Sequence, residues 1–456
     1  MSVKFDDPNL LAAAGLVPVM RLARRVGLAA RVATTVTVPG SAGSDAAGKV
    51  SSIVAGMVAG ADSISDLDLL REGAIGRVLP GVKAPSTLGT FLRAFTFGHV
   101  RQLGAVAAGV LTALARLVPL LSGAAAHRDA VTWLDVDDTI RETHGYAKQG
   151  TGYGYNKIKG LNALLAVAST QVNAPVIVGH RLRCGSVNSA RGAGKFVSDA
   201  IAAARRAGAA GVIRCRLDSA YYTHKVVAAV VAGRAEFSVT ARMDAAVRKA
   251  IAGIPEQVWI SIQYPDAVYD EQLQQWVSDA QVAETAYTAF TSAGRTHRVS
   301  ARLIVRRVKR LNPATIPAGQ HELFAAYRHH AVFTNSTASM LTAEAEHRDH
   351  AIVEQVIADL KSSALAHFPS GRMNANGAWL GCAVIAYNLT RAAGVLAGGN
   401  LAKARTSTIR ARLVNIPART ATSARTVTLH LPENSRHRRQ FLAVLDAVQA
   451  PPAAAA

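Results

Sequence analysis

The sequence predicts an α/β protein: an α/β core interrupted by a β-rich insertion and preceded by an α-helical N-terminal domain. Three observations support this fold class. Residues 1–127 show apolar positions at helical spacing, and strand and helix patterns alternate from residue 128 onward. Antiparallel strand patterns dominate residues 244–325. Because 50% of the 456 residues are hydrophobic, the chain has ample material for a core, and disorder throughout is excluded.

The N-terminal domain should consist of helices joined by short breaks. Asp62 and Ser86 supply N-cap side chains, and Pro80 with Gly81 marks an interruption. We expect helices over residues 10–30, 50–59, 63–79 and 87–121. Residues 104–126 are apolar enough to raise the question of a membrane span, but Arg116 and Pro119 are costly in lipid. We therefore expect a bundle helix there and no membrane partner.

The core should come in two parts, residues 128–243 and 326–397. The first part holds strands beginning at Val131 and Gly211, with a helix over 189–207 between them. In the insertion, 244–325, the alternation of Val299 and Ala301 with Ser300 and Arg302 suits a sheet with one buried face. The second part holds a strand over 327–335 and helices over 341–365 and 377–393. Residues 398–456 are predicted to be a basic C-terminal tail with little core.

Charge and cysteine usage restrict the function. Lys and Arg outnumber Asp and Glu by 51 to 30, which gives a net charge of +21. Such a balance favours a polyanionic partner over the substrates of an ordinary metabolic enzyme. The three cysteines, Cys184, Cys215 and Cys382, lie far apart in the sequence. This spacing argues against a disulfide framework and a Cys-based zinc site, and it fits a reducing cytoplasm.

Two aspartates end predicted strands, where ligands collect in open α/β sheets. Asp137 closes the strand beginning at Val131, and Asp218 closes the strand beginning at Gly211. Alternation along a strand points Asp135 and Asp137 to one face and Asp138 to the other. Two readings stay open for each: a metal ligand, or a solvated turn acid at Asp137 and a helix N-cap at Asp218.

A third acid, Glu354, lies on the predicted helix over 341–365. At ~100° per residue, His347, His350, Glu354 and Lys361 fall within about 60° of one another. This stripe is either a plain solvated face or part of a site. A zinc site is disfavoured because no His-Glu-x-x-His motif or Cys partner accompanies the two histidines. Two aspartates and a glutamate are instead hard oxygen ligands suited to Mg²⁺ or Mn²⁺, and two such ions can support phosphoryl transfer.

The order Asp, Asp, Glu on strand, strand and helix resembles the DDE transposases of bacterial insertion sequences, whose catalytic core is RNase H-like. The chain looks closer still to insertion-sequence family thirteen-eighty. The stretches that carry the resemblance are residues 61–68, 84–93, 134–139, 152–160, 216–221 and 354–361. It implies Asp137, Asp218 and Glu354 as catalytic, metal-holding residues. The choice of Asp137 rests on its place two residues before Thr139.

The resemblance also implies a reaction and partners. The reaction is metal-dependent phosphodiester cleavage at insertion-sequence ends, followed by strand transfer into target double-stranded DNA. The implied state is a homo-oligomer on DNA, in the bacterial cytoplasm at the nucleoid. Lys361 would hold a DNA phosphate, while His347 and His350 replace the Tyr and Arg of the wider group's signature. Two alternatives stay open: a non-enzymatic DNA-binding protein derived from a transposase, and an RNase H-like nuclease.

Basic residues next to the predicted acids are further candidates for DNA contacts. Because the phosphate backbone dominates protein–DNA affinity, lysines and arginines beside a cleavage site are the expected ligands. A plain solvated hairpin would carry the same residue types, so each position is an expectation only. These candidates are Lys157, Lys159, Arg181, Arg183 and Arg191.

Overall fold

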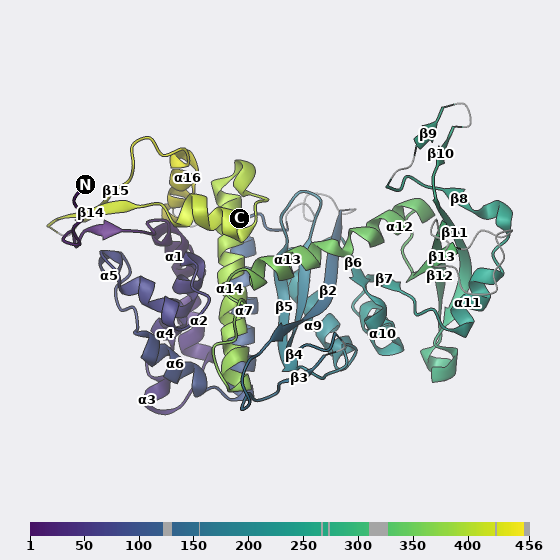
Figure 1. Cartoon of the computed structure of the whole chain (residues 1–456), viewed down its shortest axis with the longest axis horizontal. Coiled ribbons are helices and arrows are strands. Elements are labelled where there is room, and N and C mark those ends of the chain that lie inside the picture. The colour runs from purple at the N-terminus through teal and green to yellow at the C-terminus, as the bar shows by residue number, and fades with distance from the viewer. Residues whose placement is uncertain are drawn as a thin grey trace.

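The computed structural model describes residues 1–121, 130–154, 156–265, 268–271, 274–309, 327–424 and 426–450. The molecule is elongated, with the N-terminal helices at one end, a sheet in the middle and the strands of the predicted insertion at the other end (Figure 1). The predicted boundaries at 127 and 325 lie outside the described residues. The fold class is mixed α/β, as predicted.

The N-terminal part is helical, but the expected long helices are divided. Gly27 has a φ of 74°, a backbone conformation that favours glycine, and it separates the first two helices. Thr96 caps the longest helix of this part by accepting from the His99 amide. The elements are α1 (Leu16–Arg25), α2 (Leu28–Thr35), α3 (Gly40–Gly43), α4 (Ala46–Ala59), η1 (Ser65–Arg71), α5 (Ile75–Val78), α6 (Pro85–Arg93) and α7 (Phe97–Leu117).

The central sheet begins as an antiparallel meander and continues with parallel strands. β2 pairs antiparallel with β4, and β4 pairs antiparallel with β5. On its other side β2 pairs parallel with β6, which pairs parallel with β7. The strands are β2 (Val131–Glu142), β3 (Gly152–Tyr153), β4 (Lys159–Ser169), β5 (Val176–Cys184), β6 (Val212–Leu217) and β7 (Glu236–Thr240). β2 and β6 therefore run side by side in the same direction. β2 continues past the end of β6 as far as Glu142, so the prediction that Asp137 closes its strand was wrong: Asp137 lies inside β2, because pairing with β4 extends the strand.

The β-rich segment extends this sheet. The strand over 327–334, expected in the second part of the core, pairs with β7 through its last three residues and with β12 along its length. The sheet thus continues from β7 through β13, β12 and β11 to β8. The elements are α11 (Ala245–Ala252), η3 (Glu256–Val258), β8 (Ile260–Ser261), β9 (Val268–Asp270), β10 (Gln275–Val277), β11 (Ala280–Ala289), η4 (Thr291–Ala293), η5 (Arg295–His297), β12 (Val299–Lys309) and β13 (Tyr327–Thr334).

Helices cover both faces of the core strands. α9 (Ala193–Arg206) and α10 (His224–Ala232) follow β5 and β6, and η2 (Ser219–Tyr221) precedes α10. The helix expected over 341–365 is interrupted: α12 (Met340–Arg348) passes through one 3-10 turn, η7 (Asp349–Ala351), into α13 (Ile352–Lys361). α13 contacts β2 and β4 and lies across the sheet (Figure 1).

The C-terminal segment is folded rather than a tail. β14 (Ala418–Ser423) pairs with β1 (Leu10–Leu11) and with β15 (Thr426–His430), and α16 (Arg438–Gln449) contacts α1 and α14. This segment therefore packs against the N-terminal helices. The pairing of β14 with β1 joins residues that are distant in the sequence, and local composition does not reveal it. The other elements of the segment are η8 (Gly399–Leu401), α15 (Thr406–Ile409) and η9 (Arg410–Val414).

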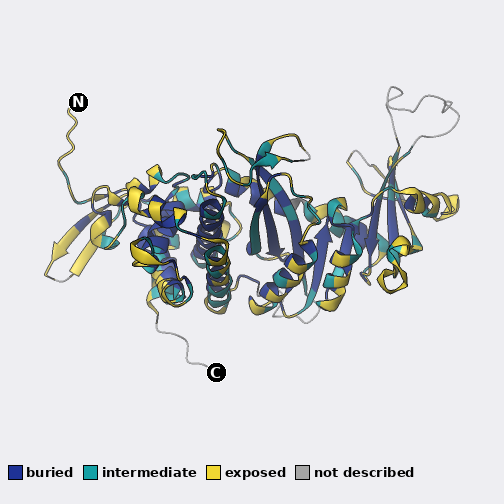
Figure 2. Ribbon diagram, turned by 90° about the horizontal axis from the view of Figure 1, so that it is seen from below, coloured by how far each residue is buried: buried dark blue, intermediate teal, exposed yellow. Residues whose placement is uncertain are grey.

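The apolar helix α14 (Met373–Ala397) stands between the N-terminal helices and the sheet (Figure 1). Its Asn388 side chain accepts from the Ile177 amide at 2.9 Å and donates to the Ile177 carbonyl at 2.9 Å, which covers part of the β5 edge. Among the described helices, α7 and α14 are long and apolar enough to cross a membrane. Inside the protein, 33% of the most apolar 18-residue stretch of α7 is buried, and 83% of that of α14. Burial inside the protein accounts for the apolar sequence of α14, which lies in the buried interior (Figure 2).

Candidate active site

The sheet register brings Asp137 next to Asp218. The parallel ladder pairs Val136 of β2 with Leu217 of β6, so Asp137, within β2, lies beside Asp218, which directly follows the end of β6. The nearness shows in the electrostatics, because the charge of Asp218 raises the pKa of Asp137. Asp218 also caps η2 by accepting from the Ala220 amide at 2.9 Å. Capping is compatible with a role as a metal ligand, because only one carboxylate oxygen of Asp218 accepts the capping hydrogen bond and the other stays available.

Both carboxyl groups are shifted toward the neutral form. Burial, with the neighbouring charge of Asp218 adding to it, raises the pKa of Asp137 to about 6, although the Asp138 amide donates to Asp137 at 2.7 Å. Burial also raises the pKa of Asp218, against the opposing effect of the Ala220 amide and His350. Among the described residues, neither carboxylate forms an ion pair with a basic side chain. A half-buried pair of unpaired acids at a strand edge is typical of a functional site.

Asp135, two residues earlier on β2, is in a different environment. It is fully buried, and the Arg216 guanidinium donates to both of its oxygens at 2.6 and 2.7 Å. His350 Nδ1 lies 3.0 Å from the same carboxylate. Burial lowers the pKa of His350, but the hydrogen bond to Asp135 and the charges of Asp135 and Asp137 outweigh it, so the pKa is raised. Asp135 is therefore neutralised by the protein itself.

The remaining aspartate, Asp138, is also paired, on the opposite face as strand alternation predicts. Arg183 on β5 forms an ion pair with Asp138 and donates to Asn162 Oδ1 at 2.9 Å and to the Ser189 carbonyl at 2.9 Å. Only 7% of the Arg183 side chain is exposed. The expectation that Arg183 contacts DNA does not fit this placement, because all of these bonds face inward.

His347 is likewise engaged inside the protein. Its Nδ1 lies 2.8 Å from Ser238 Oγ and its Nε2 lies 2.9 Å from Thr240 Oγ1, both on β7. Burial and the neighbouring charge of His350 lower the pKa of His347 to about 3, so the ring is neutral. Together His347 and His350 attach the α12–α13 segment to β7 and β2. The two histidines occupy the positions where the wider group's signature has Tyr and Arg, and in this structure both side chains contact the sheet.

Glu354 lies between His350 and Lys361 on the same stripe of the helix. Its side chain is exposed, and the described part of the chain gives it neither a hydrogen bond nor an ion pair. Lys361 is half-buried, and burial together with the charge of Arg141 lowers its pKa, whereas Asp137 raises it. α13 thus runs alongside β2, with its Lys361 end near Asp137.

The three acids do not form a closed cluster. Across the described ranges, no three His, Cys, Asp or Glu side chains form a group that could hold a metal ion. The charge of Asp218 already raises the pKa of Asp137, so a third carboxylate beside them would need a counter-charge. The donor set itself fits a hard divalent cation, since the carboxylates of Asp137 and Asp218 on adjacent strands form no ion pair with the described basic residues.

The other predicted basic residues are distributed around the core. Lys157 is exposed in the turn after β3, where its φ is 60°, and Lys159 begins β4 half-buried. Arg191 is exposed in the turn before α9. Arg181 lies on β5 over the Phe196 ring, 5.5 Å from guanidinium carbon to ring centroid. Of these four residues, Lys157 and Arg191 are fully available to a polyanion.

Sequence reasoning missed the ionic network that surrounds Asp135. Arg214 pairs with Glu236 at 2.6 Å and also with Glu346, while Arg216 donates to the Glu346 carbonyl at 2.9 Å. The signal was present in the strand over 212–217, where two arginines, buried at 5% and 1% exposure, interrupt an apolar run. A buried arginine in a strand requires carboxylate partners, so such a run predicts nearby acids.

A comparison with protein families places these acids in context. The chain matches the model described as transposase DDE domain group 1 over residues 1–453, which is almost its full length. A separate comparison with curated proteins found no match. The predicted resemblance to DDE transposases of insertion sequences is confirmed at the level of this family, which uses divalent metal ions and acts on DNA. The chain belongs to the DDE transposases of domain group 1.

Proposed function

We propose that this transposase cleaves phosphodiester bonds at the ends of its insertion sequence and joins the freed 3′ ends to target DNA. Asp137, Asp218 and Glu354 are its catalytic residues in this proposal. The observation that carries it is that Asp137, within β2, and Asp218, directly after β6, lie side by side on adjacent strands and form no ion pair with a described basic residue. The strand order, a three-stranded antiparallel meander extended by two parallel strands, supports an RNase H-like core. Assignment to insertion-sequence family thirteen-eighty is part of the same proposal.

Mg²⁺ or Mn²⁺ is the proposed cofactor, held by Asp137 and Asp218 with Glu354 as the third ligand. When bound, such ions supply activation of the attacking hydroxyl and stabilisation of the leaving oxygen. The protein keeps Asp135 and Asp138 out of this set by pairing them with Arg216 and Arg183. Both Asp137 and Asp218 remain half-buried and reachable.

The proposed DNA contacts come from residues around this edge. Lys361 is the first basic candidate, because the charge of Asp137 raises its pKa. Lys157, Lys159 and Arg191 supply further positive charge, and the net charge of +21 gives a general attraction to the DNA backbone. His347 and His350 contact the sheet, so we assign them to holding α13 and not to DNA. A homo-oligomer bound to two element ends completes the proposal.

The test is cleavage of a duplex carrying the element's terminal repeat. Purified protein with Mg²⁺ should nick this duplex, and Asp137→Asn, Asp218→Asn and Glu354→Gln should each abolish nicking. Asp349→Asn is the matched control, because Asp349 is an exposed acid on the neighbouring turn. Normal cleavage by the three variants would reject the assignment.

Two competing functions are separated by independent measurements. A non-enzymatic DNA-binding descendant would gain no thermal stability from Mn²⁺, whereas the proposed site should raise the melting temperature in the wild type but not in Asp137→Asn. An RNase H-like nuclease would hydrolyse the duplex without joining its 3′ end to a target. A strand-transfer assay distinguishes that outcome.

A further inference from the structure

A cavity lies at the edge of the sheet, and neither Asp137 nor Asp218 lines it. It has a volume of about 450 Å³ and lies between α7, β5, α9 and α14. β5 is a sheet edge here, since among the described strands it pairs with β4 alone. The volume falls in the range of small-molecule sites. Glu354, the third proposed catalytic residue, does not line this cavity either.

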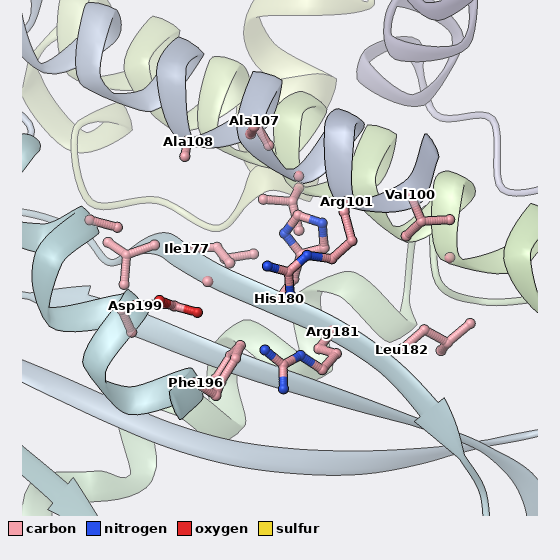
Figure 3. A pocket seen from close by; sticks show the side chains of 18 of the residues that line it. Val100, Arg101, Ala107, Ala108, Ile177, His180, Arg181, Leu182, Phe196 and Asp199 are labelled. Carbon is pink, nitrogen blue, oxygen red and sulfur yellow. The ribbon is translucent and has the colours of Figure 1, made fainter. Parts of the chain in front are cut away.

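Three arginines line this cavity from different elements: Arg101 on α7, Arg181 on β5 and Arg206 on α9. Figure 3 shows Arg101 and His180 next to each other on the α7 side of β5, and Arg181 beside Phe196. None of the three arginines forms an ion pair with a described residue. Burial and the charge of Arg101 lower the pKa of Arg181, so the like charges are held near each other at a cost.

The one acid among the lining residues, Asp199, offsets part of this charge, since it raises the pKa of Arg181. Asp199 on α9 already pairs with Lys195 one turn earlier. His180 is neutral, because burial and the charge of Arg181 lower its pKa to about 4. It therefore adds hydrogen-bonding capacity without adding charge. With three arginines and one aspartate that is shared with Lys195, the cavity carries a net positive charge.

The rest of the wall is apolar. Ala105 and Ala108 of α7, Ile177 of β5 and Val384 of α14 face the same space. A bare inorganic ion would leave these surfaces in water, so the matching ligand carries an apolar part as well as an anionic head. Guanidinium groups bind phosphates and carboxylates through paired donors. A phosphate monoester, with about two negative charges at neutral pH, offsets several arginines better than a carboxylate does.

We propose that this cavity binds a phosphate monoester with an apolar or planar substituent, such as a nucleotide, through Arg101 and Arg181. Two sources share that chemistry: a free nucleoside monophosphate and the 5′-phosphate end of a DNA strand. The proposal does not depend on Asp137, Asp218 or Glu354. In this proposal the exposed Arg101 and the half-buried Arg181 bind the same phosphate.

The test is calorimetric titration of the full chain with AMP and with short duplexes that differ only in a 5′-phosphate or 5′-hydroxyl end. Binding of AMP identifies the free source. Tighter binding of the phosphorylated duplex alone identifies the DNA end. Either preference should weaken by about tenfold in Arg101→Ala and in Arg181→Gln, because each removes a charge-assisted contact.

Two further variants keep the result interpretable. Ala108→Phe fills the cavity without touching an arginine and should weaken the same ligand, while Arg295→Ala removes an exposed arginine of the insertion and should have no effect. Circular dichroism checks that each variant is folded. The proposal is overturned if neither AMP nor the 5′-phosphate is preferred. It is also overturned if the preference persists in both arginine variants and in Ala108→Phe.

Discussion

Asp135 and Asp137 lie two residues apart on one face of the same strand, yet their surroundings are opposite. Asp135 is fully buried, accepts two bonds from Arg216 and contacts His350. Asp137 is half-buried, its pKa is raised to about 6, and the described residues offer it no ion pair. The protein thus supplies cations to one acid and withholds them from the next.

This difference separates structural charge from functional charge. A buried carboxylate that the protein neutralises holds elements together, here β2, β6 and the turn that precedes α13. A carboxylate left unpaired beside another acid is costly in the folded state and is retained where an external cation is to be bound. Substitutions at the two positions should therefore change stability in opposite directions.

The largest effect is expected at the paired acid. Asp135→Asn keeps the shape of the side chain but leaves the Arg216 guanidinium, only 1% exposed, without a counter-charge. Breaking a buried ion pair from one side costs about 3 to 5 kcal/mol. We expect a loss of this size in the free energy of unfolding measured by urea denaturation. Asp349→Asn, on an exposed turn, should change it little; an equal loss there would show that the buried pair is not the cause.

A gain in stability is expected at the unpaired acid. The pKa of Asp137 is raised to about 6 from 3.8, so ionising it disfavours the folded state. Below pH 3.8 the acid is neutral in both states and Asp137→Asn should resemble the wild type. As the pH rises to about 6, the wild type loses stability that the variant keeps. Above that pH the variant should be more stable by about 1 to 3 kcal/mol.

The measurement is urea denaturation at several pH values between 4 and 8 in the absence of divalent ions. Asp218→Asn should give the same sign, because burial also raises its pKa. A variant less stable than the wild type at pH 8 would mean that Asp137 has a cation partner in solution. In that case the contrast with Asp135 would collapse.

Much of the fold was within reach of sequence patterns. The strands around Val131 and Gly211, the alternation over 299–306 and the apolar helix near 377–393 have local signatures, and each appears in the structure. The break at η7 and the pairing of β1 with β14 depend on contacts between distant segments. Periodicity within a window carries no information about such contacts, so the continuous helix and the C-terminal tail were wrong.

The site was predictable in part for the same reason. Strand alternation places Asp135 and Asp137 on one face and Asp138 on the other, and the contacts of His350 and Arg183 agree. Alternation cannot tell which acid is already neutralised, since Arg183 reaches Asp138 from β5 and His347 reaches Ser238 from α12. These bonds occupy Arg183 and His347 inside the protein, which weighs against the DNA contacts expected of them.

The smallest effect concerns Lys361, whose pKa is raised by the charge of Asp137. Lys361 is half-buried and bears on Asp137 only through its charge, so Lys361→Ala should leave the free energy of unfolding within about 0.5 kcal/mol. If Lys361 holds a DNA phosphate, the variant should bind end-containing duplex more weakly, and the slope of log K against log salt should fall by about 0.9. Lys4→Ala, an exposed lysine at the N-terminus, should leave the slope unchanged. An unaltered slope in Lys361→Ala would mean that Lys361 balances the charge of the protein's own acids, as Arg216 does for Asp135. The DNA would then have to bind away from α13.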